Sequence, residues 1–271
     1  MNCRWGVVAG WAIVCWGAIS SLAVGELLVV GPGERGPLRY YGLDDYHIQA
    51  GAKITSPAAS GPPGTIVRTE HAFEYGGLGG VRIDGGEFSG GNATYVGPID
   101  SYAEVWSGSG AWINSSSVDI YGGQFRGGMA YSLSGSGSVL AGTALSLSRS
   151  VARIHGGVFQ GGVPVTPNLP YEPTNFPRNV DLAIVASTVH LYGGEFAAVA
   201  LNSRSVLHVY GRHFDHGFNV VRGEFADGRP LHFIYSSNGG STVVLHTVPE
   251  PGVGAMIAGV VLGIGRRRRR I

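Results

Sequence analysis

The sequence predicts an all-β protein built as a right-handed parallel β-helix, or β-solenoid. Glycine is far above its usual share of about 7%, with 46 of 271 residues. The glycines separate short segments in which apolar and polar residues alternate, which is typical of strands. No convincing amphipathic helix occurs between residues 26 and 247, and one short motif recurs along this stretch.

The recurring motif is a four-residue alternating segment followed by Gly-Gly-x-Phe. Its five copies are residues 81–88, 118–125, 152–159, 189–196 and 207–214. In the last copy Arg212 replaces the second glycine. Successive phenylalanines are 37, 34, 37 and 18 residues apart. These intervals indicate a unit near 18 residues that sometimes doubles, so a long interval is either two coils or one coil with an inserted loop.

Each copy predicts the same local geometry. The first and third residues of the segment point inward, and the second and fourth point outward. The glycine pair forms a tight corner that would strain other residues, and phenylalanine turns back inward to stack on its counterparts in neighbouring coils. The pattern resembles the Gly-rich β-helical passenger segments of exported bacterial adhesins and autotransporters over residues 81–214. A β-sandwich or β-prism is the alternative, but neither explains why one motif recurs.

The segments that flank the repeats are expected to cap them. Residues 26–80 lack the motif and are predicted to be an irregular N-terminal cap. Five prolines between residues 163 and 178 predict a loop, because proline is nearly excluded from sheet interiors. Residues 215–247 are predicted to form a C-terminal β cap, with hairpin turns around Asp227-Gly228 and at Asn238-Gly239-Gly240.

The first 25 residues have the organisation of a secretory signal peptide. Met1–Arg4 carry one positive charge, and Trp5–Val24 are almost wholly apolar. Small residues precede the expected signal peptidase site after Gly25; an uncleaved membrane anchor is the alternative. Both cysteines, Cys3 and Cys15, lie in this segment, so the exported body would contain no disulfide.

The C-terminal tail has three parts. It covers residues 248–271, begins with Val248, Pro249, Glu250 and Pro251, and continues with an apolar run, Gly252–Gly265. The cluster that follows consists of Arg266, Arg267, Arg268, Arg269 and Arg270. The apolar run can enter a bilayer, while the arginines stay on the cytoplasmic side. Its 14 residues are short for a full span of about 20, although snorkelling arginines can cover the difference.

This tail closely resembles the PEP-CTERM sorting signal of Gram-negative bacteria that make extracellular polysaccharide. The resemblance implies that an exosortase recognises Pro249, Glu250, Pro251 and the arginine cluster and cleaves near the motif. It also implies transit through the inner membrane and a final place at the cell surface or in the matrix of a biofilm. A plain tail anchor and a nucleic-acid-binding arginine run are the alternatives.

The charge of the body argues against nucleic-acid binding. Arg4 and the arginine cluster hold 6 of the 19 basic residues, and Glu250 is one of 18 acidic residues. The stretch 26–248 therefore has 13 basic and 17 acidic residues, a net charge of about −4, with Lys53 as its only lysine. Nucleic-acid binding needs a clustered cationic surface, so no nucleic acid is expected as a partner.

Candidate catalytic groups are few. A glycoside hydrolase needs two carboxylates on one face. The sequence offers Asp44 with Asp45 and Glu70 with Glu74, and all four are expected to be solvated surface groups. A polysaccharide lyase needs a base and often Ca²⁺ held by clustered acidic oxygens, and no such spacing occurs. The prediction is therefore that the chain is not an enzyme.

The densest set of possible metal ligands lies near the last copy of the motif. It consists of His208, His213, Asp215 and His216, residue types that suit Zn²⁺. His208 occupies an outward strand position and His213 a corner. No metal site and no cofactor are therefore predicted.

The outward fourth residues of the copies form the most interesting column. It is headed by Asp84 and continues with Tyr121, His155, Tyr192 and Tyr210. If the coils stack directly, these side chains form an aromatic strip. Aromatic faces stack on sugars and on partner proteins, although such residues can also simply cover the strand surface.

Together these features predict a non-catalytic structural or adhesive protein of the surface or extracellular matrix, with extracellular polysaccharide as a partner. The alternative is a carbohydrate-active enzyme on the same scaffold, a polysaccharide lyase or hydrolase.

Overall fold

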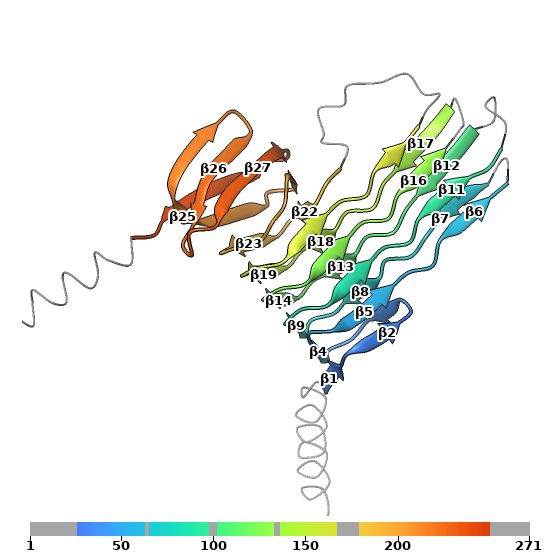
Figure 1. Cartoon of the computed structure of the whole chain (residues 1–271), viewed down its shortest axis with the longest axis horizontal. Coiled ribbons are helices and arrows are strands. Elements are labelled where there is room, and N and C mark those ends of the chain that lie inside the picture. The colour runs from blue at the N-terminus through green and yellow to red at the C-terminus, as the bar shows by residue number, and fades with distance from the viewer. Residues whose placement is uncertain (1–25, 63–64, 98–101, 133–135, 167–178, 250–271) are drawn as a thin grey trace, which may run out of the picture.

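The computed structural model describes residues 26–249, apart from 63–64, 98–101, 133–135 and 167–178. These residues form an all-β parallel solenoid of about five turns (Figure 1). Within these ranges no helix is present, and so none is suited to crossing a membrane. The predicted signal peptide and residues 250–271 of the predicted sorting tail lie outside the described residues.

Three stacks of parallel strands form the body of the solenoid. The first face consists of β1 (Leu27–Val30), β4 (Asp45–Ile48), β9 (Gly80–Ile83), β14 (Ser117–Ile120), β19 (Val151–Ile154), β23 (Thr188–Leu191), β25 (Val206–Gly217) and β28 (Thr242–Thr247). The second face consists of β3 (Leu38–Tyr40), β8 (Phe73–Gly76), β13 (Ala111–Asn114), β18 (Leu145–Ser148), β22 (Leu182–Val185), β24 (Ala198–Asn202) and β27 (Pro230–Ser237). The third stack consists of β2 (Gly33–Arg35), β5 (Ala52–Thr55), β10 (Glu87–Ser89), β15 (Gln124–Arg126) and β20 (Val158–Gln160).

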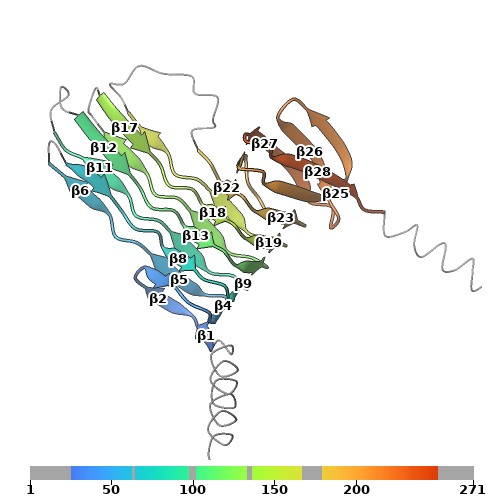
Figure 2. The same ribbon diagram turned by 180° about the vertical axis from the view of Figure 1, so that it is seen from behind.

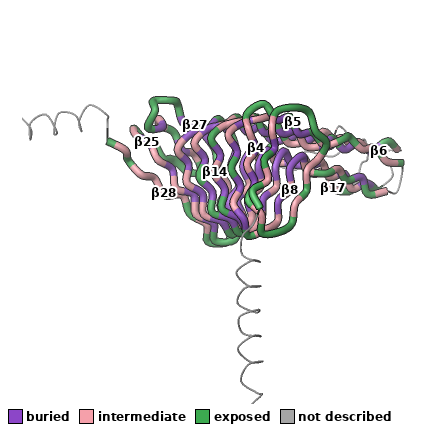
Figure 3. Tube along the Cα trace, turned by 90° about the horizontal axis from the view of Figure 1, so that it is seen from below, coloured by how far each residue is buried: buried purple, intermediate pink, exposed green. Residues whose placement is uncertain are grey.

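Two smaller stacks form a lobe that projects from this body (Figures 1 and 3). One consists of β6 (Ala59–Gly61), β11 (Ala93–Tyr95), β16 (Ala130–Ser132) and β21 (Pro164–Val165). The other consists of β7 (Ile66–Arg68), β12 (Tyr102–Trp106) and β17 (Ser136–Leu140). The lobe has its own small core of Val67, Ala93, Tyr95, Ala103, Val105 and Ala130.

Each long interval of the sequence is one coil with a structured extension. From β9 the chain runs through β10, β11, β12 and β13 before β14 pairs with β9. The described residues beyond a minimal turn build the lobe and do not form a second coil. Residues 167–178, which make up most of the predicted proline-rich loop, lie outside the described residues. The 18-residue interval is a coil without a lobe, since β23 passes through β24 directly to β25. In the proline-rich segment, Pro164 and Val165 form β21 at the edge of a lobe sheet, where proline is tolerated.

The inward and outward alternation predicted for the motif is confirmed. Val81, Val118, Ala152, Val189 and Leu207 are aligned across neighbouring strands and are all buried. The outward positions are exposed or half-buried. The main core therefore runs the length of the solenoid as stacked rows of like residues, which Figure 3 shows as bands of buried positions.

The phenylalanine stack is also confirmed for the first three copies. Phe88, Phe125 and Phe159 are buried, with ring centroids 4.6 and 4.8 Å apart. We call these three residues the Phe ladder. The corner that precedes each ring depends on the second glycine of the pair, where φ lies between 112° and 121° at Gly86, Gly123, Gly157 and Gly194. Other residues rarely adopt this conformation.

Residues 26–80 are not irregular, contrary to the prediction. They contain β1 to β8, and β4 to β8 form a complete coil. Ile54 takes the position of the ladder ring beneath Phe88. Ile54 follows Ile48 by six positions, whereas Phe88 follows Ile83 by five. This coil therefore lacks both the aromatic residue and the spacing by which the motif is recognised.

The fifth copy does not turn the corner that the motif predicts. Where earlier copies have a glycine with positive φ, the chain has Arg212, and β25 continues to Gly217. It then pairs antiparallel with β26 (Val220–Phe225), which pairs antiparallel with β27. Phe214 is thus outside the Phe ladder, and Phe233 of β27 packs against Phe196, with ring centroids 5.2 Å apart.

One of the two predicted hairpins is present in the C-terminal cap. The turn around Asp227-Gly228 joins β26 and β27 antiparallel, as expected. The turn at Asn238-Gly239-Gly240 does not form a hairpin, because β27 pairs parallel with β24 while β28 pairs parallel with β25. It carries the chain from one face to the other, as seen at the C-terminal end in Figure 2.

Buried serines mark the opposite corner, between the second and first faces. Ser116, Ser150, Ser187 and Ser205 are at most 6% exposed. The backbone N–H of each donates to the hydroxyl of the serine in the next coil, ending at Ser241. This row satisfies donors that would otherwise be buried without a partner.

Candidate functional site

The aromatic strip predicted from the sequence forms a continuous stack on the first face. Ring centroids are 4.8 Å apart for Tyr121 and His155, 5.0 Å for His155 and Tyr192, and 4.5 Å for Tyr192 and Tyr210. His246 of β28 extends the stack, 4.5 Å from Tyr210. We call these five residues the outer ladder. His246 was not predicted, because nothing in the sequence shows that β28 lies beside β25.

The outer ladder presents ring edges rather than ring faces to a ligand. Its neighbouring rings are within 15° of parallel, so they cover one another. At one end the Arg82 guanidinium carbon lies 4.8 Å from the Tyr121 ring centroid, and at the other His246 covers Tyr210. The expected stacking of sugars on ring faces therefore does not fit this geometry. What the strip offers is a row of hydroxyls and ring nitrogens.

A cluster of imidazoles lies beside the outer ladder. His190 and His208 stack with centroids 4.8 Å apart. His190 Nδ1 is 2.9 Å from the Tyr210 hydroxyl, and His208 Nδ1 is 2.9 Å from His246 Nε2. Burial is the main cause that lowers the pKa of both His190 and His208, and the charge of neighbouring imidazoles lowers it further. Their neutral forms are therefore favoured in the folded protein.

Asp84, which heads the column, is part of an ion-pair network. His47 Nε2 lies 2.6 Å from Asp84 Oδ2, and Arg82 Nε lies 2.8 Å from Asp84 Oδ1. These bonds hold the pKa of the Asp84 carboxyl below its usual range, with the bond to His47 as the largest cause. The ion pair with Asp84 thus holds the Arg82 guanidinium over the Tyr121 ring.

A groove with a volume of about 550 Å³ runs along the corner next to the outer ladder. Its floor is backbone, formed by Gly51, Gly86, Gly123 and Gly157 from four successive coils. Each glycine of the last three follows an outward residue of the first face by two positions. The outer ladder therefore lies on one flank of the glycine floor, although none of its side chains lines the groove. We call this feature the corner groove.

The other side of the corner groove is a column of exposed side chains. It consists of Lys53, Glu87, Gln124, Val158 and Glu195, which are in register from coil to coil. In the motif Gly-Gly-x-Phe these are the x residues, apart from Lys53. The sequence analysis missed them, although the signal was available, since a residue next to an inward phenylalanine points outward.

Arg229 lies at the C-terminal end of the corner groove. It comes from the turn between β26 and β27, and Arg229 Nη2 donates to the His155 carbonyl over 3.3 Å. Arg229 Nε pairs with Asp227 Oδ2 at 2.6 Å. The groove thus extends from Gly51, Ala52 and Lys53 at its N-terminal end to Arg229, a cap residue that is already ion-paired.

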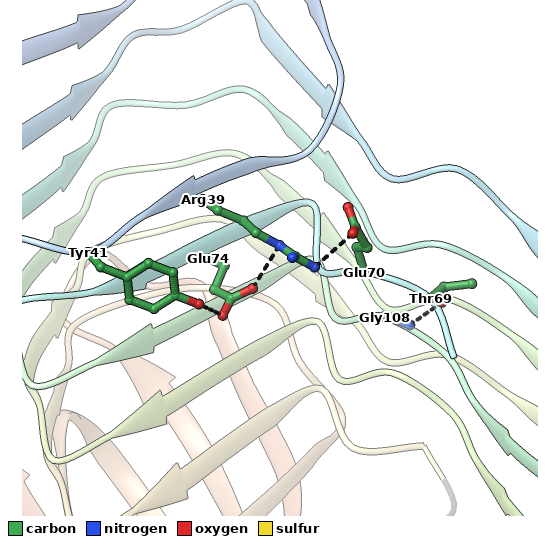
Figure 4. A network of polar contacts seen from close by, with 6 residues as sticks. All are labelled: Arg39, Tyr41, Thr69, Glu70, Glu74 and Gly108. Atoms are coloured by element: carbon green, nitrogen blue, oxygen red, sulfur yellow. Dashed lines mark hydrogen bonds and ion pairs between the residues drawn. The ribbon is translucent and has the colours of Figure 1, made fainter. Parts of the chain in front are cut away.

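Glu70 is exposed, as expected, whereas Glu74 is largely covered, and both belong to a network of polar contacts (Figure 4). Arg39 of β3 lies between them, with Nη2 2.9 Å from Glu70 Oε1 and Nε 3.2 Å from Glu74 Oε2. The Glu74 side chain is only 14% exposed. Tyr41 donates its hydroxyl hydrogen to Glu74, and that bond is the main cause that raises the pKa of Tyr41.

One guanidinium, that of Arg39, engages both carboxylates of this network. Nearby, His71 accepts a hydrogen bond from the Ser109 N–H over 3.0 Å through Nδ1, and burial lowers the pKa of His71. Arg39 was missed because 31 residues separate it from Glu70 in the sequence; only the pairing of β3 with β8 brings them together.

The pair Asp44 and Asp45 has structural contacts as well. The Asp44 carboxylate accepts from the Glu26 N–H at 3.0 Å, and the Asp45 carboxylate accepts from the Gly80 N–H at 2.6 Å. These bonds join the start of β1 and the start of β9 to the intervening coil. Each carboxylate thus links neighbouring strands of the first face.

The four possible metal ligands do not converge. Each has a different neighbour: His208 contacts His246, His213 contacts Glu224, Asp215 contacts Arg222, and His216 contacts Tyr235. Within the described parts of the chain no group of three or more such side chains is arranged to hold a metal ion.

Of the predicted sorting residues, only Pro249 lies within the described residues, where it is exposed. Comparison with protein-family models, with curated proteins and with solved structures finds no match to this chain.

Proposed function

We propose that this chain is an exported, non-catalytic structural or adhesive protein that binds extracellular polysaccharide at the surface or in the matrix of a biofilm-forming Gram-negative bacterium. The observation that carries the proposal is the corner groove. It spans four coils, and three of its floor glycines, Gly86, Gly123 and Gly157, repeat one backbone geometry, so it suits an extended polymer with a repeating unit better than a compact molecule. The proposed solenoid is right-handed, the hand that crossovers between parallel strands generally have.

Export and sorting are proposed from the two ends of the sequence. A signal helix cleaved after Gly25 directs the chain across the inner membrane. An exosortase then recognises the tail from Pro249 to Arg270, whose apolar part is proposed to be a transmembrane helix in transit. The position of the last strand supports this division, because β28 ends at Thr247 and the Val248 N–H still bonds to the Gly211 carbonyl at 2.7 Å. Cleavage at the motif would leave every described strand intact.

The sorting part is tested by intact mass of the protein recovered from its producing cells. We expect a mass that lacks residues 1–25 and the chain beyond about Val248. A mass that retains the arginine cluster would mean a plain tail anchor, and the exosortase assignment would be withdrawn.

The binding part is tested by affinity electrophoresis of the full chain in gels that contain purified envelope polysaccharides. Gln124→Trp places a large side chain on the wall of the corner groove and should abolish the retardation. The matched control is Gln160→Trp, at an exposed position of β20 that does not line the groove. Equal retardation of both variants and the unmodified protein would exclude the groove as the binding site.

The same preparations distinguish the enzymatic alternative. New reducing ends would indicate a hydrolase, and unsaturated uronates would indicate a lyase. Turnover that disappears in Glu74→Gln would contradict the non-catalytic proposal and redirect attention to the network around Arg39.

A further inference from the structure

The wall of the corner groove has a definite chemical order. From the N-terminal end it presents an ammonium, a carboxylate, an amide, an apolar group and a second carboxylate, from Lys53, Glu87, Gln124, Val158 and Glu195. Neighbouring positions lie on adjacent parallel strands, about 4.8 Å apart. That spacing is close to the length of one sugar in an extended chain, so successive residues of the wall can meet successive sugars.

The two cations that line the groove already have carboxylate partners. Lys53 Nζ is 2.6 Å from Glu34 Oε1, and Arg229 Nε is 2.6 Å from Asp227 Oδ2. A nearby cation, Arg126, donates through Nη2 to Gln124 Oε1 over 3.0 Å. Both lining cations are therefore already paired with carboxylates, and neither offers an unpaired charge to an anionic polymer.

The two carboxylates of the wall, Glu87 and Glu195, are exposed and line the groove. Among the described residues, neither forms an ion pair within 4.0 Å. Lys53, the cross-strand neighbour of Glu87, attracts its charge but forms its ion pair with Glu34. A carboxylate accepts strong hydrogen bonds from hydroxyls. Gln124, whose oxygen is engaged by Arg126, has its amide nitrogen as a donor. Val158, which is 42% exposed, offers an apolar contact to the C–H face of a sugar.

We propose that the corner groove selects a neutral, hydroxyl-rich linear glycan, which lies along the solenoid axis, and rejects polyuronates. Glu87 and Glu195 accept hydrogen bonds from sugar hydroxyls, and Gln124 donates between them. A polyuronate brings its own carboxylates against these two, and like charges placed together oppose binding. This inference rests on the proposed polysaccharide-binding function and specifies the ligand of the same groove.

The test compares two probes of equal length, a neutral β-linked glucan oligosaccharide and an oligogalacturonate, by titration calorimetry with the full chain at low salt. We expect the glucan to bind about tenfold more tightly or better. In Glu87→Gln/Glu195→Gln, which keeps the shape and removes both charges, the glucan should bind more weakly and the oligogalacturonate more tightly. Glu104→Gln, on the lobe strand β12, is the control for loss of an acidic residue away from the groove and should change neither affinity.

The outcomes separate this inference from the proposed function. Oligogalacturonate binding that equals or exceeds glucan binding, and that Gln124→Trp removes, would overturn the selectivity while leaving the groove as a polysaccharide site. Equal loss of binding in Glu104→Gln and in the double variant would overturn the roles of Glu87 and Glu195. No binding of either probe would overturn the selectivity and the polysaccharide-binding function together.

Discussion

The solenoid contains two aromatic stacks with almost the same spacing and very different surroundings. The Phe ladder has centroids 4.6 to 4.8 Å apart and its rings are at most 4% exposed. The outer ladder has centroids 4.5 to 5.0 Å apart, but its first ring, Tyr121, is 46% exposed. Ring spacing follows from the distance between strands in both cases. What differs is the apolar area removed from water, and this is the larger contribution to stability.

The largest expected effect comes from the Phe ladder. Phe125→Ala should lower the free energy of unfolding by about 3–5 kcal/mol, because it removes a buried ring between two others and leaves a cavity. Urea unfolding followed by circular dichroism measures the loss. A loss below about 1 kcal/mol would mean that the ladder does not stabilise the core.

A smaller loss is expected at the corner that joins the two ladders. Gly123 has φ of 113°, and an added Cβ would lie 3.0 Å from the Gly86 carbonyl oxygen. Gly123→Ala should therefore cost about 1–3 kcal/mol of unfolding free energy. Gly122→Ala is the matched control, because an added Cβ there would be 3.3 Å from the nearest atom and φ is not positive. Equal losses in the two variants would show that the corner does not depend on positive φ.

Acid should destabilise the folded protein through the imidazole cluster of His190 and His208 beside the outer ladder. The folded-state pKa of His190 and His208 is lowered, so the stability that these residues contribute is present above their unfolded pKa of about 6.5. It is lost as the pH falls through that value toward the folded pKa. His246, Arg153 and Tyr210 are the nearby titratable or charged groups.

The measurement is the Tm of the protein at pH 7.5 and at pH 5.5. We expect the decrease between these two values to become smaller in His190→Gln/His208→Gln. His232→Gln, at an exposed position of β27, should keep the full decrease. A decrease that is the same in all three proteins would show that this cluster does not cause the acid sensitivity.

The smallest effect is expected from a single ring of the outer ladder. Tyr192→Ala removes stacking on His155 and Tyr210 but creates no enclosed cavity, so we expect a loss of about 1 kcal/mol in unfolding free energy. Chemical unfolding of this variant beside Phe125→Ala gives the comparison directly. Equal losses would mean that burial does not distinguish the two ladders.

The features predicted correctly from the sequence are those that depend on the type and position of single residues. Alternation placed Val118 and Ile120 inward, and the motif placed Phe125 on Phe88. The lobe was not predicted as structure, because aligned residues such as Thr94 and Tyr131 share no motif and are held by backbone pairing. The coil formed by β4 to β8 was not predicted, because Ile54 occupies the position that phenylalanine has in the Phe ladder.

The candidate site was predicted only in part, for a related reason. The column of Tyr121, His155, Tyr192 and Tyr210 could be placed because one coil repeats the next. The corner groove arises from the shape of the glycine corner, where Arg229 reaches it from the cap, and His246 joins the outer ladder from β28. Residues brought together by the reversal of the chain after β25 leave no periodic trace in the sequence.

The replacement of a corner glycine by Arg212 has a consequence for the size of the molecule. A stack of equivalent coils has no preferred number of members, since each coil meets its neighbour in the same way. In this chain the coils end at Arg212, because the positive φ of the glycine corner is unfavourable for arginine. Strand β25 therefore continues past the corner, and β26 and β27 form a hairpin over the last coil. The number of coils is therefore specified by different residues from those that specify the geometry of each coil. Duplication of a coil upstream would give a longer rod with the same two ends.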